Sequence, residues 1–155
     1  SDEYSMSLGA YAESTRSAMQ SCINEKHLDK LVTIANPLDI NPGADDEVHA
    51  HMAELMLNDE GIDAVVIGLD PHSPVTHTLV EAFRMDAPGG ILERLSAVRE
   101  RFRKPLVAVV DGGAQFEPFR NALRERNIPV FPVCDRAIAT LSLYMEARLR
   151  VKELV

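Results

Sequence analysis

The sequence predicts an α/β domain built on a mainly parallel sheet, because short apolar runs alternate along it with segments of helical periodicity. The runs at residues 64–69 and 106–110 are apolar at consecutive positions and rich in β-branched residues. This pattern is typical of parallel strands that are buried on both faces. We therefore expect these two runs as adjacent central strands, joined by a right-handed crossover and covered by helices on both faces.

Three weaker runs extend the predicted sheet. Residues 31–35, with a continuation to residue 40, and residues 130–133 are expected as strands, and residues 4–8 as a further, weaker strand. The prediction is thus a flavodoxin-like three-layer sandwich with a mainly parallel sheet of about four or five strands. The whole chain, residues 1–155, is expected to form one such domain.

Five segments place residues at the spacing of one helix face and are predicted to be helices. The faces are formed by Thr15, Met19 and Cys22; Val48, Met52 and Leu55; Leu92, Leu95 and Val98; Phe116, Phe119 and Leu123; and Ile138, Leu141, Met145 and Leu149. Ser14 and Asp45 are predicted N-caps. The helix that carries Phe116, Phe119 and Leu123 should end before Pro129, and the long loop 70–90 should hold a short helix at 75–83.

Charge and composition narrow the function classes. The net charge of −8 argues against a basic nucleic-acid surface, although a local glycine turn in an acidic protein can still bind an anion. Cys22 and Cys134 lack metal-site spacing and are interpreted as buried, reduced thiols. No apolar run is long enough for a bilayer, and the first residues lack signal-peptide features, so we expect a cytoplasmic protein without a membrane partner.

Two loops at predicted strand ends could contact a ligand. Asn36 and Asp39 lie in a segment with two prolines and Gly43; we favour a self-bracing turn over a binding loop. Gly112 and Gly113 follow a central strand directly and precede a helix, a position that suits phosphate. A tight βα turn explains the two glycines equally well, because no complete dinucleotide or P-loop motif is present.

The residues alone predict no active site. Asp70 and His72 follow a central strand and could act as phosphoacceptor, base or proton relay, but isolated polar loop residues are usually plain surface. We find no nucleophile with a base, no paired carboxylates and no metal signature. Catalytic residues and metal ligands are therefore both predicted to be none.

From Ala35 onward the sequence resembles the last α/β domain of the NDP-forming acyl-CoA ligases, the superfamily of ADP-forming acetyl-CoA synthetase and succinyl-CoA synthetase. The resemblance rests on the order and spacing of several segments rather than on one motif. These are Ala35-Asn36-Pro37-Leu38-Asp39-Ile40, Asn58 to Ile67, Lys104 to Gly113, and Arg126 to Ala137.

The resemblance implies a domain that packs against a phosphohistidine domain and helps enclose the phosphoryl-transfer site. It implies CoA-binding, phosphohistidine and ATP-grasp domains as partners, and CoA, ATP or ADP and magnesium as cofactors of the full-length enzyme but not of this part. Asn36, Asp39, Gly112 and Gly113 are then the expected contacts to phosphate or to a partner domain. The isolated chain is expected to be inactive.

The sequence departs from the family pattern in two places. Asp70-Pro71-His72 stands where the succinyl-type domain has two glycines, which puts a phosphate contact at that turn in doubt. The chain also starts after the family's first strand, loop and helix, so we expect it to be a piece of a longer polypeptide.

Two alternative functions remain: a receiver-like signalling domain with Asp70 or Asp111 as phosphoacceptor, and an interaction module without a ligand. Against the receiver, Lys104-Pro105 precedes its strand, whereas a receiver's Lys-Pro follows one.

Overall fold

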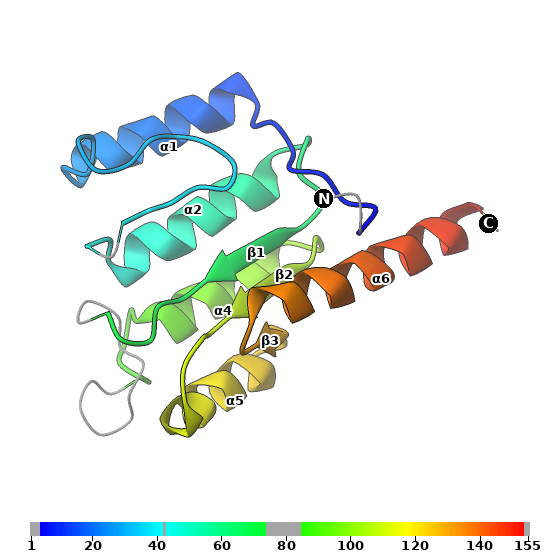
Figure 1. The fold of residues 1–155 in the computed structure, drawn as a ribbon. Helices are drawn as coiled ribbons and strands as arrows, with labels where there is room; N and C mark the ends of the chain where they lie inside the picture. The colour runs from blue at the N-terminus through cyan, green and yellow to red at the C-terminus, as the bar shows by residue number, and fades with distance from the viewer. Residues whose placement is uncertain (1–3, 42, 74–84, 154–155) are drawn as a thin grey trace.

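The computed structural model describes residues 4–41, 43–73 and 85–153, which form an α/β arrangement around a three-stranded parallel sheet (Figure 1). The elements in chain order are α1 (Glu13–Glu25), α2 (Asp46–Asn58), β1 (Val65–Gly68), α4 (Ile91–Arg101), β2 (Leu106–Val109), the 3₁₀ helix η1 (Ala114–Phe116), α5 (Glu117–Glu125), β3 (Val130–Phe131) and α6 (Cys134–Glu153). The expected helix at 75–83 lies outside the described residues.

The sheet has the order β1-β2-β3, and both pairs are parallel. Val65 lies opposite Leu106, and Ala108 lies opposite Val130. The prediction that the runs 64–69 and 106–110 form adjacent, parallel strands is confirmed. All four residues of β2 are buried, which explains why that run is apolar at every position.

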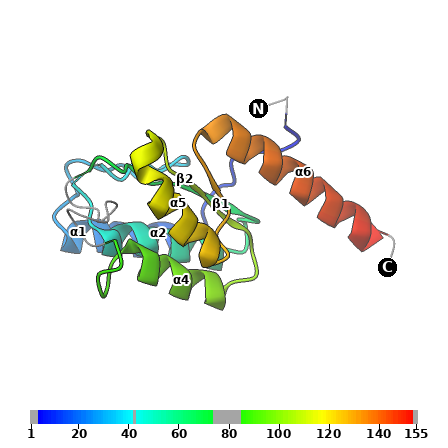
Figure 2. The ribbon, with the colours of Figure 1, turned by 90° about the horizontal axis from the view of Figure 1, so that it is seen from below.

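Helices cover both faces of the sheet, as predicted. Alternate strand residues point to opposite faces. Val65 and Ile67 belong to the same hydrophobic core cluster as residues of α1, α2, α4 and α5, whereas Val107 and Val109 cluster with Ala137 and Leu141 of α6. Figure 2 shows α6 on the opposite side of the strands from α2 and α4. The first face carries most of the core, and α6 is the one helix of the described residues that packs on the second face.

Two predicted strands are absent from the described residues. Residues 31–40 form no strand: Val32 and Ile34 bury their side chains in the core, but the backbone is held by local and side-chain bonds instead of a ladder. The N–H of Val32 donates to Leu28 O, and Arg16 donates to Ile34 O. Residues 4–8 are likewise irregular, and the predicted strand 130–133 shortens to two residues.

The helix termini separate a correct cap prediction from a wrong one. Asp45 caps α2, because its carboxylate accepts the N–H of Val48 at 2.9 Å. Ser14 is not a cap: α1 begins at Glu13, and its N-cap residue Ala12 has no side-chain cap bond.

The interpretation of both cysteines as buried was also wrong, since Cys22 is half-buried and Cys134 is exposed, although both are free thiols.

No helix among the described residues is both long enough and apolar enough to span a membrane.

Candidate functional site

The candidate site lies where the central strands end. β1 ends at Gly68 and β2 at Val109, and because the strands are parallel, the turns that follow them meet at one edge of the sheet. Ligands of open parallel sheets bind outside this carboxyl edge. The turn after β1 contains Asp70 and His72, and the turn after β2 contains Gly112 and Gly113.

Gly112 is required by the backbone of its turn. Its φ angle is +138°, a region that residues with a side chain rarely adopt. A Cβ atom there would lie 2.6 Å from Cδ2 of Phe116 and 3.4 Å from Cγ of Pro71. Gly112 is thus packed under Phe116, whereas Gly113 is exposed with an ordinary φ of −73°.

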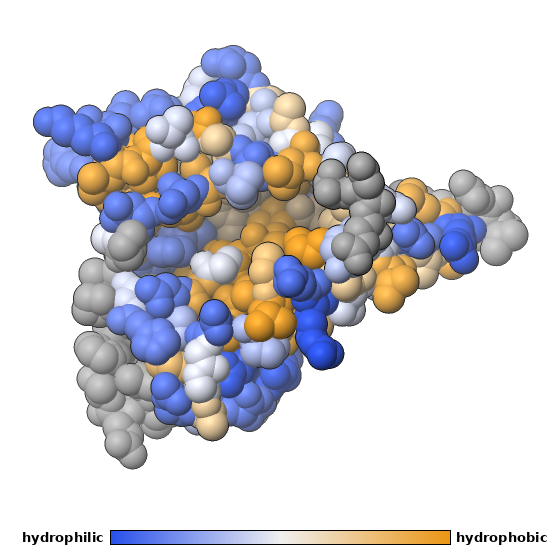
Figure 3. Space-filling view, in the orientation of Figure 1, coloured by the Kyte–Doolittle hydropathy of each residue, from blue (hydrophilic) through white to orange (hydrophobic). Residues whose placement is uncertain are grey.

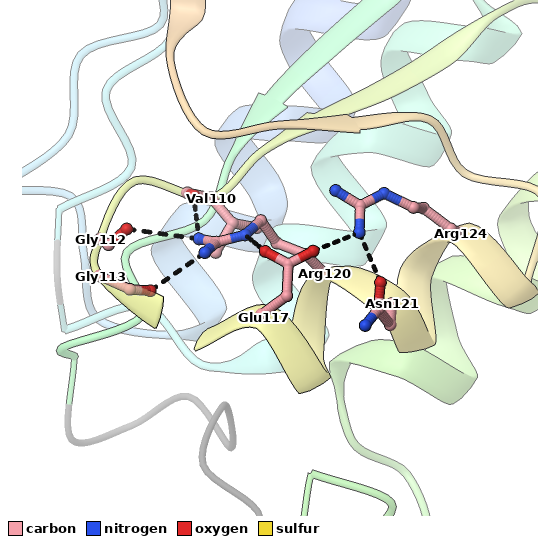
Figure 4. A network of polar contacts seen from close by, with 7 residues as sticks. All are labelled: Val110, Gly112, Gly113, Glu117, Arg120, Asn121 and Arg124. Carbon is pink, nitrogen blue, oxygen red and sulfur yellow. Dashed lines mark hydrogen bonds and ion pairs between the residues drawn. The ribbon is translucent and has the colours of Figure 1, made fainter. Parts of the chain in front are cut away.

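Arg120 braces this turn from the inside (Figure 4). Its guanidinium donates to the carbonyl oxygens of Val110 at 3.1 Å, Gly112 at 3.5 Å and Gly113 at 3.0 Å. Only 5% of the residue is exposed. One buried cation therefore binds three carbonyls of the turn, and it draws them inward. This bracing is what a tight βα turn needs, whether or not the turn also contacts a ligand.

Glu117 completes the network at the start of α5. Arg120 Nε donates to Glu117 Oε2 at 2.7 Å, and Arg124 Nη1 donates to Glu117 Oε1 at 2.6 Å (Figure 4). Arg124 and Arg120, in that order of effect, hold the pKa of the Glu117 carboxyl below its usual value. The charge of Arg120 is thus balanced within the chain.

Asp70 and His72 form a local turn. Asp70 Oδ1 accepts the N–H of His72 at 2.9 Å, and it lies 3.6 Å from His72 Nδ1. The His72 ring meets Phe116 edge-on, with centroids 4.9 Å apart. Both side chains are more than half exposed. The structure thus links the two strand-end turns through the contact of His72 with Phe116.

The loop 36–41 is braced by its own polar side chains, as the favoured interpretation predicted. Asn36 Nδ2 donates to the carbonyl oxygen of Gly9 at 2.8 Å. Asp39 Oδ1 accepts the N–H of Asn41 at 3.1 Å, and Asn41 Oδ1 accepts the N–H of Gly43 at 2.9 Å. Asn36 is therefore engaged with the N-terminal segment, while Asp39 is exposed.

A cavity of about 540 Å³ lies beside β1, and it brings together some of the predicted residues but not all of them. Asp39 and Asp70 line it, along with residues of β1 and α2. Asn36, Gly112 and Gly113 are not among its lining residues. No Lys or Arg lines it within the described part of the chain, which is unlike a pocket for a polyphosphate.

A second hollow of about 520 Å³ lies between α1, α2 and α4 and does contain cations. Two of these cations form ion pairs within the chain: Lys26 Nζ lies 2.5 Å from Glu47 and 3.4 Å from Asp45, and Arg101 lies 2.5 Å from Glu54. The third, Arg94, donates from Nε to the carbonyl oxygen of Gly89. In residues 4–41, 43–73 and 85–153, no group of three His, Cys, Asp or Glu side chains is placed to hold a metal ion.

No model of a known protein family matches the sequence, and no curated protein matches it significantly. Solved structures do match. PH0766 from Pyrococcus horikoshii OT3 superposes with a TM-score of 0.71 over 95% of this chain, at 22% identity. The dinucleotide-forming acetyl-coenzyme A synthetase 1 of Ca. Korarchaeum cryptofilum superposes with a TM-score of 0.62 over 94% of the chain, at 18% identity, in its apo form and in its complex with phosphate and ADP.

The fold is similar to that of one region of acetyl-coenzyme A synthetase. The predicted likeness to the acyl-CoA ligases is confirmed at the level of the fold. The chain spans about a third of the proteins it matches, 31% of PH0766 and 34% of the synthetase. These proteins therefore contain further regions that have no counterpart in residues 1–155.

Arg120 is the residue that sequence reasoning missed at this edge. In the sequence it looks like ordinary surface charge, because it stands in a helix that also carries Glu117, Arg124 and Glu125. A signal existed: Glu117 and Arg120 are three residues apart in the first turns of the helix that follows the two glycines. A helix cation directly after a Gly-Gly turn can reach back to the carbonyls of that turn.

Proposed function

We propose that this chain is a domain of an NDP-forming acyl-CoA synthetase, that it packs near the phosphoryl-transfer site, and that it is inactive alone. The observation that carries the proposal is the superposition on acetyl-coenzyme A synthetase over 94% of this chain but only 34% of the synthetase. Nearly the whole of this chain matches one third of the enzyme. This is the relationship expected between a domain and the multidomain enzyme that contains it.

The chemistry of the carboxyl edge favours an accessory role, in which the domain encloses a site, over a catalytic role. The cavity beside β1 is lined mainly by apolar residues, together with two carboxylates and the polar residues Asn41 and His49, and the buried guanidinium of Arg120 is already bound to carbonyls. Such a surface can close one side of a phosphoryl site, but it does not offer the gathered cations that stabilise a transferring phosphoryl group. The exposed amide edge at Gly113 and the exposed carboxylate of Asp39 are the proposed contacts, with Gly112 and Asn36 holding their loops.

The remaining chemistry belongs to other domains in this proposal. A CoA-binding domain, a phosphohistidine domain and an ATP-grasp domain of the same enzyme supply the thiol, the phosphoryl carrier and the nucleotide with its magnesium. Catalysis needs all of them held together, because orientation accounts for a large part of the lowering of the barrier.

The first experiment incubates the isolated chain with ATP, acetate, CoA and magnesium. We expect no acetyl-CoA and no stable phosphorylation, and we expect calorimetry with ATP or CoA to detect no submillimolar binding. Acetyl-CoA formation or submillimolar binding would contradict the proposed role. Phosphorylation of His72 would do so as well, because it would make this chain the phosphoryl carrier.

A receiver domain is the alternative that one observation favours. The exposed residues Asp70 and Asp111 follow two adjacent parallel strands. Acetyl phosphate and magnesium would label one of them in a receiver, and we expect no label. Labelling that Asp70→Asn or Asp111→Asn abolishes would replace the ligase proposal.

The second experiment uses the full-length enzyme that contains this domain. Gly113→Val is expected to lower ligase activity more than it lowers the stability of the domain, because Gly113 is exposed and a side chain there would meet mainly the flexible side chain of Gln115. Equal losses of activity and stability would identify the turn as purely structural.

A further inference from the structure

The outer side of α6 carries an apolar ridge that is exposed in the described part of the chain. Leu141 packs toward the sheet, and Leu143, which follows two residues later on the helix, therefore points away from it. Ala147 and Val151 follow Leu143 at steps of four residues and share its face. Leu143 is 69% exposed and Val151 is 60% exposed, and Ala147 between them is exposed as well.

The ridge lies on the part of α6 that leaves the body of the molecule. Figure 1 shows the C-terminal half of the helix extending beyond the sheet, and Figure 3 shows it as a narrow projection with both apolar and charged residues. A helix that covers one face of a sheet needs a single apolar stripe, which Ala137, Leu141 and Met145 already provide. A second apolar face, on the opposite side of a projecting helix, is a feature of an interaction surface.

The shape of the ridge suits a crossing with an identical ridge. Residues four apart form the ridges that interdigitate in the commonest class of helix packing in globular proteins. This ridge has a branched apolar residue at each end, Leu143 and Val151, and the small residue Ala147 in the middle. Two antiparallel copies that cross near Ala147 can approach closely, and Leu143 of each copy then lies beside Val151 of the other.

The charges beside the ridge decide the occupant and its direction. Glu146 and Arg150 lie one turn apart on the same flank of the ridge, and their charged groups are 3.9 Å apart. In an antiparallel two-fold pair this flank meets the same flank of the other copy in reversed order, so Glu146 of each copy lies opposite Arg150 of the other. In a parallel pair the flank would meet the opposite flank, which carries Arg148 and no carboxylate. The flank is therefore complementary to itself in the antiparallel arrangement.

We propose that this face of α6 is the contact between two copies of the chain, with the two helices antiparallel and crossing near Ala147. One helix face from each copy makes a small interface, so the dimer is weak and forms reversibly with concentration. α6 begins just after β3 ends, so its C-terminal half runs back from the carboxyl edge to which the phosphate or domain contact of Gly113 is assigned. The proposal goes beyond the ligase role, and its test measures association alone, so the failure of one is distinguishable from the failure of the other.

The test measures the mass of the whole chain in solution by sedimentation equilibrium, from micromolar to millimolar concentration. We expect the unmodified chain to pass reversibly from monomer to dimer over this range. Ala147→Glu places a carboxylate at the crossing point of each copy and should weaken the dimer at least about tenfold. Leu31→Glu is the matched control, because it adds the same charge at an apolar residue that is 60% exposed but lies outside α6, and it should leave the dimer unchanged.

Charge reversal separates the antiparallel pair from nonspecific association. Arg150→Glu leaves two glutamates on the flank and Glu146→Arg leaves two arginines, so each variant alone should dimerise at least about tenfold more weakly than the unmodified chain. A mixture of the two variants should dimerise at least as tightly as the unmodified chain, because the glutamates of one copy then face the arginines of the other.

Three results would overturn the proposal. The first is a chain that stays monomeric at millimolar concentration. The second is a dimer that Ala147→Glu and Leu31→Glu weaken equally, since the contact would then not lie on this ridge. The third is a mixture of the two charge-reversal variants that associates no better than each variant alone.

Discussion

Arg120 lies against the backbone of the glycine turn, with Nη2 3.0 Å from the carbonyl oxygen of Gly113. The same guanidinium also bonds the carbonyls of Val110 and Gly112 and the carboxylate of Glu117. A turn held by a buried cation keeps one shape, because each carbonyl would lose its partner if the turn moved. The shape of the carboxyl edge at β2 therefore depends on one side chain of α5.

Arg120→Met should destabilise the chain by about 2–4 kcal/mol, because it leaves buried carbonyls without donors and keeps a similar volume. The measurement is urea unfolding at neutral pH. Arg124→Met is the matched control: Arg124 is 43% exposed and bonds the same carboxylate, so its loss should cost less than about 1 kcal/mol. Similar losses for both variants would show that Arg120 does not brace the turn.

Gly112→Ala should also destabilise the chain, by about 1–3 kcal/mol, because it forces an unfavourable φ and a contact with Phe116. Gly68→Ala is the control, since a methyl group there meets open space and removes the entropic cost of a strand glycine. Thermal unfolding of the two variants compares them directly. A Gly112→Ala protein as stable as Gly68→Ala would mean that the turn has other conformations available.

The fold was predictable where side chains alone determine it. β2 is buried at every position, and Val65 and Ile67 of β1 are buried on the face that carries most of the core, so the apolar composition of the two runs indicates their central position. The run 31–35 shares that composition but packs its Val32 and Ile34 on helices without pairing, and composition cannot distinguish burial in a ladder from burial beside one. The number of strands was therefore less predictable than the identity of the central pair.

The candidate site was predictable only in part, for a similar reason. The topology rule located the turns at Asp70 and Gly112 from strand order alone. It could not reveal that Asp39 lines the cavity beside β1 while Gly113 lies outside its lining, since this depends on the path of an irregular loop. The role of Arg120 depends on a contact between a helix and the preceding turn, which side-chain periodicity does not encode.

The two predicted caps provide a matched test of helix capping. Asp45→Ala should destabilise the chain by about 1 kcal/mol, because the carboxylate no longer accepts the N–H of Val48. Ser14→Ala should change stability by less than about 0.5 kcal/mol, since Ser14 is exposed inside the first turn of α1 and caps nothing. Chemical unfolding of both proteins checks the difference. A larger effect at Ser14 than at Asp45 would contradict the assigned helix starts.

Acid stability should depend on Asp59, which joins three segments at the amino edge of the sheet. The hydroxyl of Thr15 and the N–H of Ala12 and Gly61 donate to its carboxylate, and they hold its pKa below the usual value for aspartate. Lys104 Nζ donates to the carbonyl oxygen of the same residue at 2.6 Å. These bonds favour the charged carboxylate in the folded chain over the unfolded one.

The direction of the pH dependence follows from that lowered pKa. The unfolded chain takes up a proton at Asp59 near the ordinary value of about 3.9, before the folded chain does, so the contribution is complete above that pH and is lost as pH falls through the lower pKa of the folded state. Asp59→Asn should therefore be less stable than the unmodified chain at pH 7, and the difference should shrink between pH 5 and pH 3. Urea unfolding at these pH values measures it. Glu60→Gln, at the exposed neighbouring residue, controls for the loss of one negative charge. A difference between Asp59→Asn and the unmodified chain that stays constant from pH 7 to pH 3 would show that the carboxylate charge does not stabilise this junction.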